Sequence, residues 1–180
     1  DYLNSMLGIT KALGGRYIDI TDEHIKLAPF IEVDNEKYTK EFLIPWLKDI
    51  YKRSNKNQES GKKENKAIFD SLKSLTHIAK TERTFERFIA QIDDEHTQSI
   101  FAQFKKELPF NILSGNSDDI FAEDFCMFNK EPILKMHDSQ KFPILDFIYY
   151  KQIKLVEKAS LSLGQVTPTL MILDEASFEF

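Results

Sequence analysis

Hydrophobic and polar positions along the chain follow two different periods, which predict a mixture of helices and strands. Residues 2–13 have the apolar spacing of a helix, and Gly14-Gly15 ends it because glycine tolerates the left-handed geometry of a helix C-terminus. Residues 16–21 alternate polar and apolar side chains, which is typical of a half-buried strand. The N-terminal part therefore predicts a helix followed by a strand.

The pattern becomes helical again from Glu36. One apolar face is formed by residues spaced three and four apart, namely Phe42, Leu43, Trp46, Leu47, Ile50 and Tyr51. Pro45 lies inside this pattern, and proline lacks the N–H that a helix interior needs. We therefore expect either a kink or a helix that restarts at this proline.

Residues 52–66 contain no apolar side chain and predict an exposed loop. A patch that binds phosphate or nucleic acid is the less favoured interpretation of the same residues. Three more helices are predicted at 67–78, 84–92 and 94–108, and the first has an apolar stripe of Phe69, Leu72, Leu75 and Ile78. The acidic run at 93–95 is interpreted as a cap of the third helix, in preference to a metal site.

The C-terminal third predicts a strand at 125–128, a helix and a second strand at 169–173. The helix is expected to start near residues 139–142 with Pro143 in its first turn, and its buried stripe would be Leu145, Ile148, Tyr149, Ile153 and Val156. The run at 169–173 is continuously apolar, as in a strand buried on both faces of a parallel sheet. This order of elements places the chain in the α/β class.

Composition narrows the function classes. The 180 residues are 42% hydrophobic with 15 Phe, which fits a folded domain, and the net charge of −5 gives no support for a nucleic-acid surface. The single cysteine, Cys126, excludes an internal disulfide and is interpreted as a core thiol. The four histidines share no ligand spacing, which disfavours a zinc site.

The strongest chemical signal is the pair Asp174 and Glu175 directly after the apolar strand. A buried parallel strand delivers its last residues to the carboxyl edge of the sheet, where such folds bind ligands. There Asp174 could accept a hydrogen bond from a water on Mg²⁺, and Glu175 could polarise the water that attacks a γ-phosphate. This is the Walker B arrangement. The competing interpretation is an acidic pair that merely begins the next helix.

Several segments in order resemble the ATPase domain of the type IV secretion and conjugative-transfer ATPases, the CagE/TrbE/TraC class. The last of them, Leu170 to Ala176, stands where that family carries four apolar residues and Asp-Glu-Ala. The others are Asp1 with Ser5 and 13–17, the segment 25–30 with its Pro29-Phe30, the segment 42–48, and Met127 with the helix 143–156. The resemblance spans nearly the whole chain.

The resemblance implies a partial RecA-like P-loop NTPase core with an all-helical insertion. Residues 1–35 and 109–180 would belong to the core, the latter ending at the Walker B strand, and residues 36–108 would form the insertion. The family uses ATP and Mg²⁺, assembles into homo-oligomers and works with other secretion-system components. It is cytoplasmic and peripheral to the bacterial inner membrane, and it energises DNA or protein transfer; contact of this chain with nucleic acid is left open.

Two departures from the family are visible. The chain has no Gly-x-x-x-x-Gly-Lys-Ser/Thr loop, so we expect the phosphate loop upstream of Asp1, and Ser177 replaces the family's usual Trp. Two alternatives stay open: a non-enzymatic α/β interaction domain, and another RecA-like ATPase such as a DNA-pumping coupling protein.

We predict that the 180-residue chain alone does not hydrolyse ATP, because it would carry only half of an active site. The measurement is Mg-dependent phosphate release by the purified chain. Turnover that disappears in Glu175→Gln would contradict this prediction.

Overall fold

A computed structural model describes residues 2–19, 25–107, 112–117, 126–129 and 131–163. Two short strands are present, β1 (Arg16–Asp19) and β2 (Cys126–Asn129). The helical elements are α1 (Tyr2–Ala12), α2 (Glu36–Tyr38), the π-helix η1 (Thr39–Leu43), α3 (Ile44–Ser54), α4 (Lys62–Leu75), the 3-10 turn η2 (Lys80–Glu82), α5 (Phe85–Ala90), α6 (Glu95–Glu107), α7 (Glu131–Leu134) and α8 (Asp138–Leu163).

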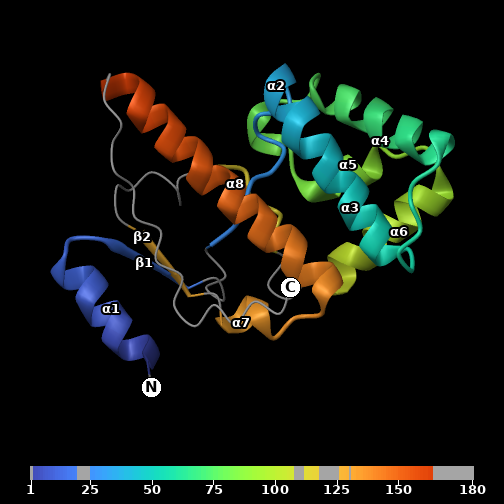
Figure 1. Ribbon diagram of the computed structural model, residues 1–180. Helices are drawn as coiled ribbons and strands as arrows, with labels where there is room; N and C mark the ends of the chain where they lie inside the picture. The colour runs from blue at the N-terminus through green and yellow to red at the C-terminus, as the bar shows by residue number, and fades with distance from the viewer. Residues whose placement is uncertain (1, 20–24, 108–111, 118–125, 130, 164–180) are drawn as a thin grey trace.

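Most of the described residues are helical, and β1 pairs with β2 in a small parallel sheet. In the ribbon, α1 and the two strands lie on one side of the long helix α8, while α2 to α6 gather on its other side (Figure 1). Helix α3 packs against both α6 and α8, and α1 contacts both strands. The arrangement is compatible with the predicted α/β class. In the part of the chain that the structure describes, no helix is long and apolar enough for a bilayer span.

Elements α2, η1 and α3 follow one another without a break, and Pro45 explains the π turn between the two α-helices. The N–H of Ile44 bonds to the carbonyl of Thr39, five residues back, so the turn before the proline is wider than in an α-helix. Proline would clash with the carbonyl four residues earlier in a regular helix. The helix thus restarts at Ile44 with Pro45 in its first turn, which confirms one of the two expected outcomes.

The predicted loop at 52–66 is shorter than expected. Helix α3 continues to Ser54 and α4 already begins at Lys62, which leaves only residues 55–61 between them. The prediction was wrong at both ends because it used the absence of apolar side chains as its signal. Lysine, glutamate and glutamine have good helix propensity, so exposed helix ends tolerate a fully polar sequence.

Residues 25–34, called here the connecting segment, lie between β1 and the helical layer. The N–H of Leu27 donates to the carbonyl of Ile112 at 2.7 Å, and the N–H of Gly115 donates to the carbonyl of Leu27 at 2.9 Å. These two bonds join the backbone before α2 to the backbone after α6. The chain therefore enters and leaves the helical stretch α2 to α6 at neighbouring points. The division of this stretch from the rest of the chain as a separate domain stays a prediction.

Side chains of the connecting segment hold the helical layer and α8. Phe30 stacks on Phe88 of α5 with ring centroids 5.0 Å apart. Asp34 accepts a hydrogen bond from Arg83, which is only 4% exposed, at 2.6 Å. Glu32 accepts one from the buried Lys151 of α8, also at 2.6 Å. Because a buried cation without a partner is costly, these two pairs fix where the segment lies.

Two predicted apolar stripes each contain one exposed residue, whereas Leu72 and Leu75 of the first and Leu145 and Ile148 of the second are buried as predicted. Phe69 is 56% exposed, and Ile68 takes its place beside Leu72. On α8, Ile153 is 52% exposed, because the buried face runs through Phe147, Ile148 and the aliphatic stem of Lys151 instead. Both errors arise because spacings of three and four are equally compatible with a helix face.

Helix α8 also begins earlier than predicted, at Asp138, so Pro143 lies inside the helix beyond its first turn. The missing N–H of Pro143 removes the bond that the carbonyl of Ser139 would accept in a regular helix. The Pro143 carbonyl itself accepts a hydrogen bond from the indole of Trp46. The first turns of α8 are thus tied to α3 from outside the helix.

We predict that Gly115→Ala destabilises the protein by roughly 1–3 kcal/mol. A Cβ at this buried position would lie 2.7 Å from both the carbonyl carbon and the carbonyl oxygen of Leu27, so the backbone must shift. Urea unfolding gives the free energy. The matched control is Gly8→Ala in α1, where nothing lies within 4 Å and alanine should stabilise the helix by about 0.5–1 kcal/mol. Equal effects at the two glycines would contradict the prediction.

Candidate functional site

The predicted Walker B residues, Asp174 and Glu175, lie outside the residues that the structure describes, as does the strand that precedes them. Their roles therefore stay a prediction. Two other features can be built from described residues: the carboxyl edge of the β1–β2 sheet, and a groove between the α3 region and α8.

The strand β1 is positioned by the turn that ends α1. Gly14 has a φ of 74°, which is the left-handed geometry predicted for this glycine, and the N–H of Gly15 bonds to the carbonyl of Thr10 at 2.9 Å. The Thr10 side chain is fully buried, and its hydroxyl lies 3.5 Å from the sulfur of Met127 on β2. Helix α1 thus covers the sheet and fixes where β1 starts.

The two strands run in the same direction, with Arg16 opposite Cys126 and Asp19 opposite Asn129. Their carboxyl ends consequently reach the same edge of the sheet, which presents Asp19 and Asn129 side by side. Open α/β sheets bind ligands at this edge. Parallel neighbours need a crossover connection, and here that connection includes α2 to α6.

The groove has one wall from η1 and α3 and another from α8. Glu41, Pro45 and Asp49 line the first wall, spaced four residues apart along the helix. Asp146, Tyr149 and Ile153 line the second, spaced three and four apart. Between the walls lie the aromatic rings of Phe42, Trp46 and Tyr150, and the hollow has a volume of about 430 Å³. Sequence analysis missed this site, although the spacing on both helices was a usable signal.

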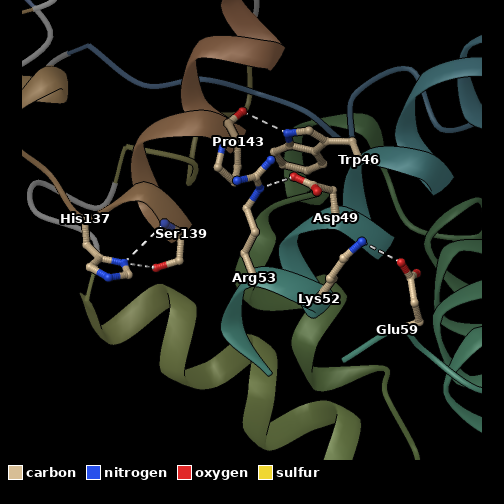
Figure 2. A network of polar contacts seen from close by, with 8 residues as sticks. All are labelled: Trp46, Asp49, Lys52, Arg53, Glu59, His137, Ser139 and Pro143. Atoms are coloured by element: carbon tan, nitrogen blue, oxygen red, sulfur yellow. Dashed lines mark hydrogen bonds and ion pairs between the residues drawn. The ribbon is translucent and has the colours of Figure 1, made fainter. Parts of the chain in front are cut away.

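Aromatic stacking and one buried hydrogen bond hold the two walls together. The rings of Phe42 and Tyr150 stack with centroids 4.0 Å apart. The indole N–H of Trp46 donates to the carbonyl of Pro143 at 2.8 Å (Figure 2). In the same view Arg53 reaches Asp49 at 2.5 Å, and its guanidinium also lies 4.8 Å from the Phe142 ring. The groove is thus shaped by contacts between helices that are distant in sequence.

Asp146 is the electrostatically unusual group of the groove. Partial desolvation by the packed helices raises its pKa, and the nearby Asp49 carboxylate raises it further, while Arg53 acts in the opposite direction. The side chain still reaches solvent at the rim. A carboxylate that Asp49 repels, and whose charge Arg53 offsets only in part, is a site that a cation would stabilise.

His137 and Ser139 form a close pair at the start of α8. The Nδ1 atom of His137 lies 2.8 Å from the Ser139 hydroxyl and also accepts from the Ser139 backbone N–H at 3.3 Å (Figure 2). Both contacts span only two residues, and they satisfy an N–H of the first turn of α8, so the pair acts as a helix cap.

Asp94 is likewise a cap, as the sequence predicted. Its carboxylate accepts from the N–H of Thr97 at 2.9 Å and from the Thr97 hydroxyl at 2.7 Å, and it pairs with Lys63 at 2.5 Å. Hydrogen bonds from Lys63 and Thr97 hold its pKa far below the usual range. Among the residues whose placement is described, no group of three His, Cys, Asp or Glu side chains could hold a metal ion.

Comparison of the chain with protein-family models, curated proteins and solved structures finds no match. The sheet edge and the groove are therefore interpreted from their own chemistry.

We predict that Asp146→Asn stabilises the protein at neutral pH, by less than about 1 kcal/mol because the carboxylate keeps contact with solvent. The raised pKa means that the folded state binds this proton more tightly than the unfolded chain does. The proton on Asp146 therefore stabilises the folded protein below the pKa that this group has in the unfolded chain. This stabilisation is lost as the pH rises through the pKa of the group in the folded protein. The gain from asparagine should therefore be seen at about pH 7 and vanish at about pH 3.

Urea unfolding at the two pH values measures this effect. Asp70→Asn, the same substitution on an exposed position of α4, is the control and should change stability little at either pH. A destabilised Asp146→Asn at neutral pH would show that the carboxylate is favourably paired in the folded protein.

Proposed function

We propose that the chain is part of an ATP-hydrolysing motor that energises transfer through a type IV secretion or conjugation system. In this proposal the chain belongs to a RecA-like core, with α2 to α6 as its helical insertion. Asp174 and Glu175 supply the Walker B carboxylates. The motor is a homo-oligomer that works beside other secretion-system components at the cytoplasmic face of the inner membrane.

The observation that carries the proposal is the parallel pairing of β1 with β2. Their carboxyl ends lie at one edge, and α8 follows β2 directly after the short helix α7. A helix after a parallel strand is the usual crossover to another parallel strand, and the apolar run 169–173 comes next in the sequence. A strand there, added to the same sheet in parallel, would bring Asp174 to the edge that already holds Asp19 and Asn129.

Each acidic residue has a distinct role in this proposal. Asp174 accepts a hydrogen bond from a water on Mg²⁺, which is a hard cation that prefers oxygen ligands. Glu175 orients and polarises the attacking water. ATP and Mg²⁺ supply the phosphoryl group and the charge neutralisation, and catalysis in this class is mostly positioning plus electrostatics. The 180 residues contain no phosphate loop, so in the proposed motor this loop belongs to another part of the same protein.

One observation favours a second candidate, a non-enzymatic interaction domain. The groove between α3 and α8 is a concave surface, and none of its lining residues comes from β1 or β2. The coding DNA separates the two candidates: a phosphate loop after an apolar strand upstream of Asp1 supports the motor, and a start codon without such a loop supports the interaction domain. A DNA-pumping coupling protein is a related motor, which sequence downstream of Phe180 would distinguish.

We predict that Glu175→Gln lowers Mg-dependent ATP turnover by roughly 100-fold or more in the complete gene product, because the water loses its polarising carboxylate. ATP binding should persist, since glutamine keeps the size of the side chain. The assays are phosphate release and equilibrium binding of a fluorescent ATP analogue.

The matched control is Glu179→Gln, the same change four residues beyond the motif, which should leave turnover within about twofold. If Glu175→Gln retains normal turnover, or if both variants lose it equally, the Walker B assignment fails.

A further inference from the structure

The groove between α3 and α8 has two carboxylates on opposite walls, Glu41 and Asp146, that form no close polar contact among the described residues. In the described part of the chain, neither Glu41 nor Asp146 takes part in a hydrogen bond or ion pair. Asp49, the third carboxylate, pairs with Arg53 at 2.5 Å. Arg53 acts electrostatically on Asp146, and Lys154 on Glu41. Three carboxylates thus face two cations, and the rim keeps a net negative charge above an aromatic floor.

The aromatic rings near the groove already attract cations of the protein itself. Arg53 lies 4.8 Å from the Phe142 ring, and the ammonium of Lys154 lies 5.5 Å from the Tyr150 ring. Lys154 is also bound to Glu157 at 2.6 Å, so a carboxylate outside the groove matches its charge. The surface thus combines aromatic side chains with an excess of carboxylates, and a guanidinium is attracted to both groups.

Apolar contact is available at the end of the groove. Ile153 is 52% exposed, and it continues the wall formed by Asp146 and Tyr149. The volume of about 430 Å³ is large enough for a few side chains of a partner. A segment with an arginine followed by an apolar residue would match both halves of the groove.

We propose that this groove binds an arginine-bearing, partly apolar segment of a partner protein. The guanidinium lies between Glu41 and Asp146 against the aromatic floor of the groove, and an apolar side chain of the same segment covers Ile153. Arginine suits the site better than lysine because its planar group can stack on a ring while it donates to a carboxylate.

Charge complementarity selects this occupant over the others. The carboxylates of the rim would repel nucleic acid and anionic lipid headgroups. A second copy of the chain is the remaining alternative, and its most basic segment is 52–66. The single arginine of that segment, Arg53, is already engaged with Asp49, and its other cations are lysines, of which Lys52 and Lys63 pair with Glu59 and Asp94. A separate partner with unpaired arginines is therefore favoured.

The test uses the 180-residue chain and a peptide labelled at its N-terminus, fluorescein-Leu-Arg-Ala-Leu-Leu-Arg-amide. A second peptide has citrulline in place of arginine, which keeps the shape and removes the charge. Fluorescence anisotropy measures both affinities at low salt, where exposed ion pairs are strongest. We expect the arginine peptide to bind at least about tenfold more tightly.

Two variants locate the binding. Asp146→Asn and Glu41→Gln, on opposite walls, should each weaken binding of the arginine peptide about fivefold and leave the citrulline peptide unchanged. The Asp70→Asn control on α4 should bind like the wild type. Trp46 is the only tryptophan and lies in the groove, so its emission should change on binding in the wild type and less in Asp146→Asn at the same peptide concentration.

Three results would overturn the proposal. One is no binding at about 1 mM peptide. Another is equal weakening by Asp146→Asn and Asp70→Asn, which would mean that only the net charge of the chain matters. The third is self-association in sedimentation that Asp146→Asn abolishes, which would assign the groove to a second copy. None of these results depends on ATP hydrolysis, so the groove and the motor proposal fail or stand independently.

Discussion

The connecting segment, residues 25–34, is the constraint on which the described structure depends. Most of its residues are buried. Its backbone bonds to residues 112–115, Phe30 packs in the aromatic core, and Glu32 and Asp34 hold Lys151 and Arg83. The Arg83 guanidinium also donates to the carbonyls of Thr76 and Ile78, at 3.2 and 2.8 Å. Because a buried guanidinium must be matched on all sides, the segment can adopt few positions relative to the helical layer.

The connecting segment lies between the two candidate sites, the sheet edge and the groove. The segment begins shortly after β1, whose carboxyl end contributes to the sheet edge, and it ends at the helix that forms one wall of the groove. The Tyr38 hydroxyl donates to the Pro29 carbonyl at 2.6 Å, which fixes the start of that helix. Helix α8 supplies the other wall and is held by Glu32. The same few residues therefore contact the start of one groove wall and the helix that forms the other.

Local signals predicted much of the fold. The face at Trp46, Leu47, Ile50 and Tyr51 is buried, Gly14 ends α1, and Asp94 caps α6, because each depends on residues a few positions apart. Phe69 and Ile153 were placed wrongly because the rotation of a helix is decided by distant partners. The groove escaped prediction for the same reason, since its walls are separated by about a hundred residues of sequence. Asp174 and Glu175 remain a prediction from pattern and resemblance.

The π turn at 39–43 has a consequence for how the chain tolerates change. The turn is equivalent to one additional residue in an otherwise continuous helix from Glu36 to Ser54. The side chains after the turn are therefore rotated by about 100° around the helix axis. Tyr38 before the turn and Trp46 after it can both face the core only with this phase correction. Loss of one residue within the turn would therefore restore a regular α-helix and leave Tyr38 and Trp46 on the same face.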